Sequence, residues 1–106
     1  MKAIYDKVSY KISKLTTRTY TTSFSLGIRL FDKKFHDPIY AIYGFVRLAD
    51  EIVDSFHDYD KETLMAEFRR ETVLAIERKI SLNPILNSFQ ETVHRYGIEW
   101  NHIDRF

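Results

Sequence analysis

Only five of the chain's 106 residues are glycine or proline, three Gly and two Pro, and this shortage of chain breakers limits the fold more than any other feature. Tight turns between strands usually need such residues at defined positions, and no Asn-Gly or Asp-Gly pair occurs in the chain. Sustained alternation of polar and apolar residues is absent as well. The sequence therefore predicts an all-α protein of five helices or pieces of helices.

The amino-terminal third predicts two helices separated by a polar loop. From Ala3 to about Thr17 the apolar residues recur at helical spacing, which indicates an amphipathic helix. Its apolar positions are Ile4, Val8, Ile12 and Leu15. The hydroxyl-rich run at 16–23 predicts a loop, because Ser and Thr side chains compete for backbone hydrogen bonds. A short helix is expected from Phe24 to Phe31.

Capping residues predict three further helices. Asp37, followed by proline, predicts a helix that continues to about Phe56. Asp60 and Asn83 are the expected N-caps of the next two, and Gly97 ends the last of these. The inner sides are expected to carry Leu64, Phe68, Ala75, Ile76 and Ile80, and then Ile85, Leu86, Phe89, Val93 and Tyr96. Residues from Trp100 to Phe106 resemble the start of another helix.

Composition excludes several classes of function. A length of 106 residues and a hydrophobic content of 44% suit one domain, and a net charge of +1 disfavours nucleic-acid binding through phosphate contacts. Without cysteine there is no disulfide and no thiolate nucleophile. The four histidines lack metal-ligand spacing, so surface or capping roles are expected for them. No signal peptide or membrane span is recognisable, so we expect a cytoplasmic protein with at most peripheral membrane contact.

One stripe of polar residues stands out on the central predicted helix. Tyr43, Arg47, Asp50 and Asp54 follow at spacings of four, three and four, and share an arc of roughly 60°. Most of the remaining circumference is apolar, which is typical of a helix in the middle of a bundle. The stripe is therefore expected to face an internal cavity.

The stripe has a chemistry that suits phosphate and a divalent cation. Asp50 and Asp54 repel each other across one helical turn, and a hard cation such as Mg²⁺ would relieve that repulsion. Arg47 adds a planar donor group that suits phosphate oxygens. A plainer interpretation stays open, in which these residues are a solvated helix face and Arg47 pairs with Asp50 or Glu51 across one turn.

Two motifs together resemble a known family. They are TTSF at residues 21–24 and YAIYGFVRLADEIVD at residues 40–54. They are similar to the amino-terminal part of the squalene/phytoene synthases, head-to-head prenyltransferases of the all-α isoprenoid synthase fold. The likeness extends more loosely through Asn83 to the helix that ends at Gly97.

The resemblance implies a role for each matching residue. Asp50 and Asp54 would hold Mg²⁺, or Mn²⁺ in its place, against the substrate diphosphate, with Glu51 in an outer shell. Arg47 would contact the diphosphate, with hydroxyl donors beside it, and an aromatic residue would stand near the reacting carbons. These donors are Thr21 and Ser23, the aromatic residue is Tyr43, and Phe24 would line the channel for the prenyl tail.

The implied reaction belongs to isoprenoid and carotenoid biosynthesis. Two farnesyl or two geranylgeranyl diphosphates would condense through a cyclopropyl diphosphate intermediate, with metal-assisted departure of diphosphate. Such a reaction needs cations for the leaving group and a dry, aromatic pocket for the carbocation. The residues do not decide between the C15 and C20 substrates.

The chain departs from the family pattern at its carboxyl-terminal end. Family members carry a second aspartate-rich helix and an active-site flap in a longer domain, and neither motif occurs in these 106 residues. We therefore expect residues 1–106 to be an amino-terminal fragment of one catalytic domain, inactive by itself and prone to self-association through uncovered apolar surface. Two other functions stay open: a non-catalytic scaffold or assembly module with the same fold, and a generic helical binding domain.

Overall fold

The computed structural model describes residues 2–99 and 103, and these form five α-helices, one 3-10 turn and no strand. The all-α prediction is therefore confirmed for the described part of the chain. The elements are α1 (Lys2–Tyr20), α2 (Thr22–Ile28), η1 (Lys33–Phe35), α3 (His36–Asp54), α4 (Lys61–Arg78) and α5 (Pro84–Tyr96).

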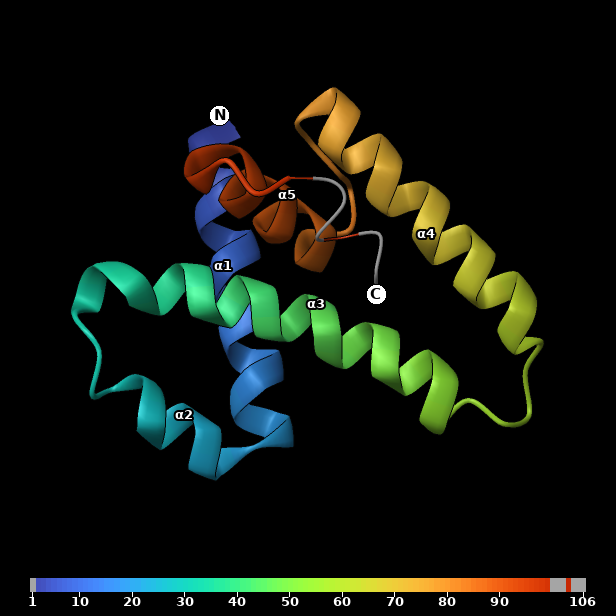
Figure 1. The fold of residues 1–106 in the computed structure, drawn as a ribbon, viewed down its shortest axis with the longest axis horizontal. Coiled ribbons are helices and arrows are strands. Elements are labelled where there is room, and N and C mark those ends of the chain that lie inside the picture. The colour runs from blue at the N-terminus through green and yellow to red at the C-terminus, as the bar shows by residue number, and fades with distance from the viewer. Residues whose placement is uncertain (1, 100–102, 104–106) are drawn as a thin grey trace.

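Helix α3 crosses the middle of the molecule and contacts α1, α4 and α5 (Figure 1). Helices α1, α3 and α5 pack against one another, whereas α4 packs against α3 and α5 on the opposite side of the molecule from α2. The short helix α2 folds back against α1. The central position predicted for the helix that carries the polar stripe is thus confirmed.

The hydroxyl-rich segment is helical, so the loop predicted for residues 16–23 is wrong. Thr16, Thr17 and Thr19 each donate a hydroxyl hydrogen bond to the carbonyl four residues earlier, at 2.9, 2.9 and 2.7 Å. Their hydroxyls are satisfied inside the helix instead of competing with it. Only Thr21 leaves the helical conformation, with φ −150° and ψ 109°, so a single extended residue joins α1 to α2.

Two of the three predicted N-caps are confirmed, and one is wrong. The Asp60 carboxylate accepts a hydrogen bond from the Thr63 backbone at 3.2 Å, and the Asn83 amide oxygen accepts from two backbone N–H groups. Asp37, in contrast, lies inside the first turn of α3, because the helix follows directly on the 3-10 turn and begins at His36, two residues before the predicted start at Pro38. Gly97 has φ 64° and ends α5 as predicted.

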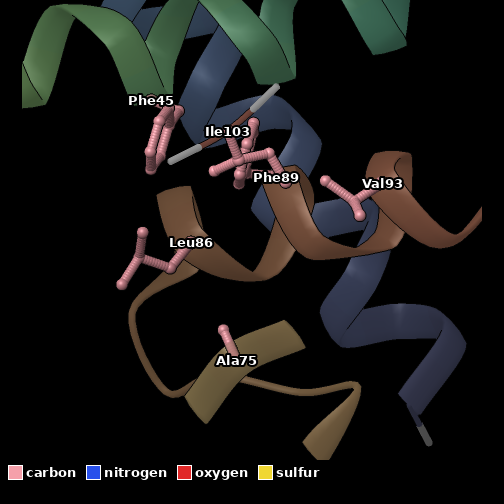
Figure 2. Close-up of a cluster of buried hydrophobic side chains, with 6 residues drawn as sticks. All are labelled: Phe45, Ala75, Leu86, Phe89, Val93 and Ile103. Atoms are coloured by element: carbon pink, nitrogen blue, oxygen red, sulfur yellow. The ribbon is translucent and has the colours of Figure 1, made fainter. Parts of the chain in front are cut away.

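An apolar core joins α3, α4 and α5. Figure 2 shows Phe45 of α3 directed toward the side chains of α5. The rings of Phe45 and Phe89 stack with centroids 3.8 Å apart, and Phe68 of α4 lies 5.4 Å from Phe45. The buried members of this cluster are Phe45, Ala75, Leu86, Phe89, Val93 and Ile103.

Helix α1 packs through its small polar side chains, contrary to the expectation that it buries its apolar row. Its buried residues are Ser9, Tyr10, Ser13 and Thr17. Ile4 and Leu15, in contrast, are more than 60% exposed. The reason is a close approach, because a Cβ atom on Gly44 of α3 would lie only 3.1 Å from the Ser13 hydroxyl. Larger aliphatic side chains would hold the two helices apart.

At this polar interface, the contact of α1 with α3 and α5, hydrogen bonds between side chains of α1 and α5 replace apolar contacts. Ser13 and Ser88 are joined at 2.6 Å, and Tyr10 bonds Thr92 at 3.1 Å. Burial raises the pKa of the Tyr10 phenol. The Asn87 amide donates to the Asp6 carboxylate at 2.8 Å and to Ser9 at 3.0 Å.

Two other features bear on the sequence predictions. Tyr96 is predicted on the inner side of α5, but this residue is 47% exposed, in the last turn of the helix. No helix among the described residues is both long and apolar enough to cross a membrane. The helix predicted from Trp100 onward falls outside the described residues, except for the buried Ile103.

Candidate functional site

The predicted polar stripe runs along α3 on the side that faces the α1–α2 corner, the bend at Thr21 where α1 joins α2. Tyr43 and Arg47 are half-buried there, whereas Asp50 and Asp54 are exposed. The apolar back of the helix is buried in the core, as its periodicity predicts, through residues that include Ala41, Phe45 and Ile52. The helix therefore presents its polar stripe outward from the core, with the first half of the stripe partly covered and the second half open to solvent. The prediction that the stripe faces an internal cavity is wrong for Asp50 and Asp54.

Arg47 is held in place by two contacts. Its guanidinium donates to the Glu51 carboxylate at 2.9 Å, and its Cζ lies 5.1 Å from the centre of the Tyr20 ring. The first contact is the pairing that the plainer interpretation of the stripe expects. The Arg47 Nε–H, however, is buried without a hydrogen-bond partner in the structure. Arg47 thus keeps a polar group unsatisfied while its position is fixed.

Tyr43 and the TTSF motif meet across the same corner. The rings of Tyr43 and Phe24 stack with centroids 4.7 Å apart and planes at 26°. Thr21 caps α2, since its hydroxyl oxygen accepts from the Phe24 backbone at 3.3 Å. Ser23 is exposed in the first turn of α2. The Phe24–Tyr43 pair therefore brings the two motifs together, and Tyr20, just before the first motif, lies on Arg47.

The two aspartates form a pair of oxygen donors rather than a closed metal site. Within the described residues no group of three potential metal ligands occurs, and neither Asp50 nor Asp54 forms an ion pair. Glu51 is engaged with Arg47. Two carboxylates one turn apart suit Mg²⁺ when phosphate oxygens and water complete its shell, which is how this cation commonly binds.

An apolar pocket beside the stripe was missed by the sequence reasoning. It has a volume of about 420 Å³ and lies between η1, the first turns of α3 and the end of α5. Ile39 and Ile42 line it from α3, next to Tyr43 in the sequence. The other side chains that line it are Phe31, Phe35, Pro38, Thr92, Tyr96 and Ile98. The exposed Tyr96 marks this pocket in the structure, but helical periodicity in the sequence places the same residue in the core.

The histidines behave as their scattered positions predict. The His36 ring is hydrogen-bonded to the Phe31 carbonyl at 2.9 Å, and the His94 ring to the Ile76 carbonyl at 2.8 Å. His57 is exposed in the loop after α3. Both bonded rings therefore stabilise the ends of neighbouring elements, whereas His102 lies outside the described residues.

A family model for squalene/phytoene synthase matches residues 17–106, which is the whole chain except residues 1–16, the greater part of α1. The chain therefore belongs to the squalene/phytoene synthase family. Its helical architecture agrees with the isoprenoid synthase fold expected for that family. A search of curated proteins and a search of solved structures each found no match.

Proposed function

We propose that the chain supplies the first metal- and diphosphate-binding half-site of a head-to-head prenyltransferase of the phytoene or squalene synthase type. The observation that carries this proposal is the arrangement of Arg47. Its guanidinium is fixed by Tyr20 and Glu51, yet its buried Nε–H has no partner. A guanidinium held in this way can receive an anion without first giving up its position.

The aromatic residues at the α1–α2 corner would serve the carbocation. Tyr43 and Phe24 form a stacked pair next to Arg47, and their ring faces can stabilise positive charge that develops on the prenyl carbons. Thr21 and Ser23 are the hydroxyl donors proposed for the diphosphate. The Thr21 oxygen already accepts the capping bond, so its hydrogen is the part that can donate.

Asp50 and Asp54 would hold Mg²⁺, with Mn²⁺ as an alternative and Glu51 in an outer role. The ion would supply positive charge that neutralises a departing diphosphate. The open position of both carboxylates on α3 supports this assignment, because a shared cation must be reached by substrate oxygens as well.

The substrate class that fits is a prenyl diphosphate, such as farnesyl or geranylgeranyl diphosphate. The 420 Å³ apolar pocket begins one turn before Tyr43 and offers a surface on which hydrocarbon can be buried. We place the reaction in isoprenoid or carotenoid biosynthesis, in the cytoplasm or at a membrane surface. We also propose that the 106-residue chain alone binds substrate without turning it over.

The test is thermal unfolding of the 106-residue chain with Mg²⁺ and farnesyl thiodiphosphate, a non-ionisable analogue, added singly and together. A ligand that binds only the folded state raises the unfolding temperature. We expect the two ligands together to stabilise the chain by more than the sum of their separate effects. This synergy should be lost in Asp50→Ala and in Asp54→Ala.

Asp58→Ala is the matched control, because Asp58 is an exposed aspartate in the loop after α3. It should keep the synergy. Equal loss in Asp58→Ala, or no synergy in the unmodified chain, would contradict the proposed half-site and favour the scaffold function. Formation of a C30 or C40 product by the 106-residue chain would contradict the predicted inactivity.

A further inference from the structure

A second cavity lies on the far side of the α1–α2 corner and shares no residue with the polar stripe. Its volume is about 290 Å³, against the roughly 30 Å³ that one water molecule occupies in the liquid. The side chains that line it are Arg18, Thr22, Ser25, Leu26 and Arg29. Four of these five are polar or charged, whereas the pocket beside Tyr43 is almost wholly apolar.

The charge of this cavity is uncompensated. Arg18 and Arg29 both line it, no carboxylate does, and neither guanidinium forms an ion pair within the described residues. Arg18 lies in the last turn of α1, where a cation complements the helix dipole. Arg29 is the C-cap of α2, where the same effect applies. Both residues are exposed, and together they make the cavity electropositive, which favours an anion there.

Ser25 adds an independent observation. Its side chain is 92% buried, lines the same cavity, and its hydroxyl has no hydrogen-bond partner in the structure. Buried polar groups nearly always have a partner, so an unpaired hydroxyl between two free arginines indicates a ligand that can accept its hydrogen. The same cavity thus offers two planar cationic donors and a neutral one.

We propose that Arg18, Arg29 and Ser25 form a phosphate-binding site on the outer face of the α1–α2 corner, distinct from the site on α3. Arginine forks and hydroxyls together recognise the oxygens of a phosphate group. Thr22 provides a second hydroxyl at the cavity. The phosphate can belong to a free phosphate or diphosphate, or to a lipid headgroup beneath which the exposed Leu26 would meet the acyl region.

The first arm of the test is titration calorimetry of the 106-residue chain with inorganic diphosphate in the presence of a chelator, so that a magnesium site cannot contribute. We expect saturable binding that weakens at least tenfold in the pair Arg18→Gln and Arg29→Gln. The pair Arg70→Gln and Arg78→Gln, exposed on α4, makes the same change in net charge and should leave binding within twofold.

Ser25→Ala separates a binding role from a structural one. It removes an unsatisfied buried hydroxyl, so the unliganded chain should be at least as resistant to urea as the unmodified one. Binding of diphosphate should nevertheless weaken several-fold. Lower stability together with unchanged binding would assign Ser25 to the fold and overturn its place in the site.

The second arm is flotation with phosphatidylcholine vesicles that contain phosphatidic acid, compared with vesicles of phosphatidylcholine alone. Binding to the former that is lost in the Arg18 and Arg29 pair identifies a lipid headgroup as the source of the phosphate. Binding of diphosphate alone identifies a soluble ligand. Failure of both probes, or equal loss in the α4 pair, would overturn the proposal and leave the function proposed for α3 unaffected, because that function is tested through its dependence on Mg²⁺.

Discussion

Two helix interfaces in this molecule bury their residues by different means. The core between α3, α4 and α5 consists of stacked phenylalanines and aliphatic side chains, whereas the polar interface consists of serine, threonine and asparagine. The first is stabilised by removal of apolar surface from water and tolerates small changes in register. The second depends on directional bonds between small side chains, which form in only one register.

The two interfaces are therefore expected to have different roles, one in the stability of the fold and the other in the position of α1 on α3. We expect the apolar core to contribute most of the free energy of unfolding. The polar interface is expected to contribute less, and to set how α1 lies on α3, which in turn places Tyr20 and Phe24 against Arg47 and Tyr43. Substitutions in the two regions should therefore differ in size and in additivity.

The largest effect is expected from Phe89→Ala in the apolar core. Phe89 is 5% exposed and stacks on Phe45, so truncation leaves a cavity that its rigid neighbours cannot fill. The free energy of unfolding should fall by about 3–5 kcal/mol, measured by urea denaturation. Phe31→Ala, at an exposed phenylalanine, is the control. A loss of similar size in that control would show that the apolar core is not the dominant source of stability.

Asn87→Ala should have the next largest effect, because Asn87 is the most connected residue of the polar interface. Its amide donates to Asp6 and Ser9, and its oxygen accepts from Gln90 and from the backbone of Ser81. Loss of these bonds leaves buried groups unpaired, and should cost about 1–3 kcal/mol in urea denaturation. A neutral effect would contradict the view that these bonds stabilise the contact.

A double-mutant cycle on Ser13 and Ser88 tests whether the two hydroxyls act as a pair. Ser88→Ala should cost about 1 kcal/mol, because it leaves the buried Ser13 hydroxyl without its 2.6 Å partner. Ser13→Ala should cost less, since the Ser88 hydroxyl still donates to the Ile85 carbonyl. The double change should cost less than the sum, since both polar groups disappear together. Strict additivity would mean that the pair contributes no coupling. In double-mutant cycles between residues of the apolar core, any coupling should come from a cavity that the two truncated side chains share.

Acid should weaken the polar interface through Asp6. Burial alone would raise the pKa of this carboxyl, but hydrogen bonds from Lys2 and Asn87 outweigh it and hold the pKa below its usual value. The ionised carboxylate therefore stabilises the fold above about pH 4, and this contribution, about 0.5 kcal/mol, is lost as the pH falls through the lower folded pKa. In Asp6→Asn the dependence of stability on pH below 4 should be shallower than in the unmodified chain. An unchanged slope would contradict the assignment.

The smallest effect on stability is expected from Leu15→Lys. This residue belongs to the apolar row of α1 and is 65% exposed, so the free energy of unfolding should change by no more than about 0.5 kcal/mol. If self-association uses this row, the same change should shift the chain toward monomer in sedimentation velocity. Persistent association in the variant would place the contact elsewhere.

Local chemistry made much of the fold predictable. Asp60, Asn83 and Gly97 mark helix ends because their side chains or backbone conformations act within a few residues. The face of α1 was not predictable, because it depends on Gly44 and Ser88, which are distant in sequence. Periodicity places apolar residues inward, and no local signal indicates that a partner helix approaches too closely for them.

The candidate site divides in the same way. The stripe on α3 follows from spacing within one helix, and the two motifs together indicate the family without any knowledge of tertiary contacts. The contacts of Arg47 with Tyr20 and of Tyr43 with Phe24, and the unpaired Ser25 hydroxyl, arise where α1 and α2 fold onto α3. The spacing within each motif does not indicate that Tyr20 lies on Arg47 or Phe24 on Tyr43.

The close approach of Gly44 to Ser13 fixes how the Tyr20 and Phe24 rings lie on Arg47 and Tyr43. Gly44 directly follows Tyr43 and precedes Arg47 by three residues, so the point where α1 and α3 touch lies within one turn of both. A bulkier residue at position 13 or 44 would change the angle between α1 and α3. Both the Tyr20 ring and the Phe24 ring would then be displaced from their contacts on α3. Substitutions at these two positions are therefore expected to weaken ligand binding as changes in the binding residues would, although neither position belongs to the proposed half-site.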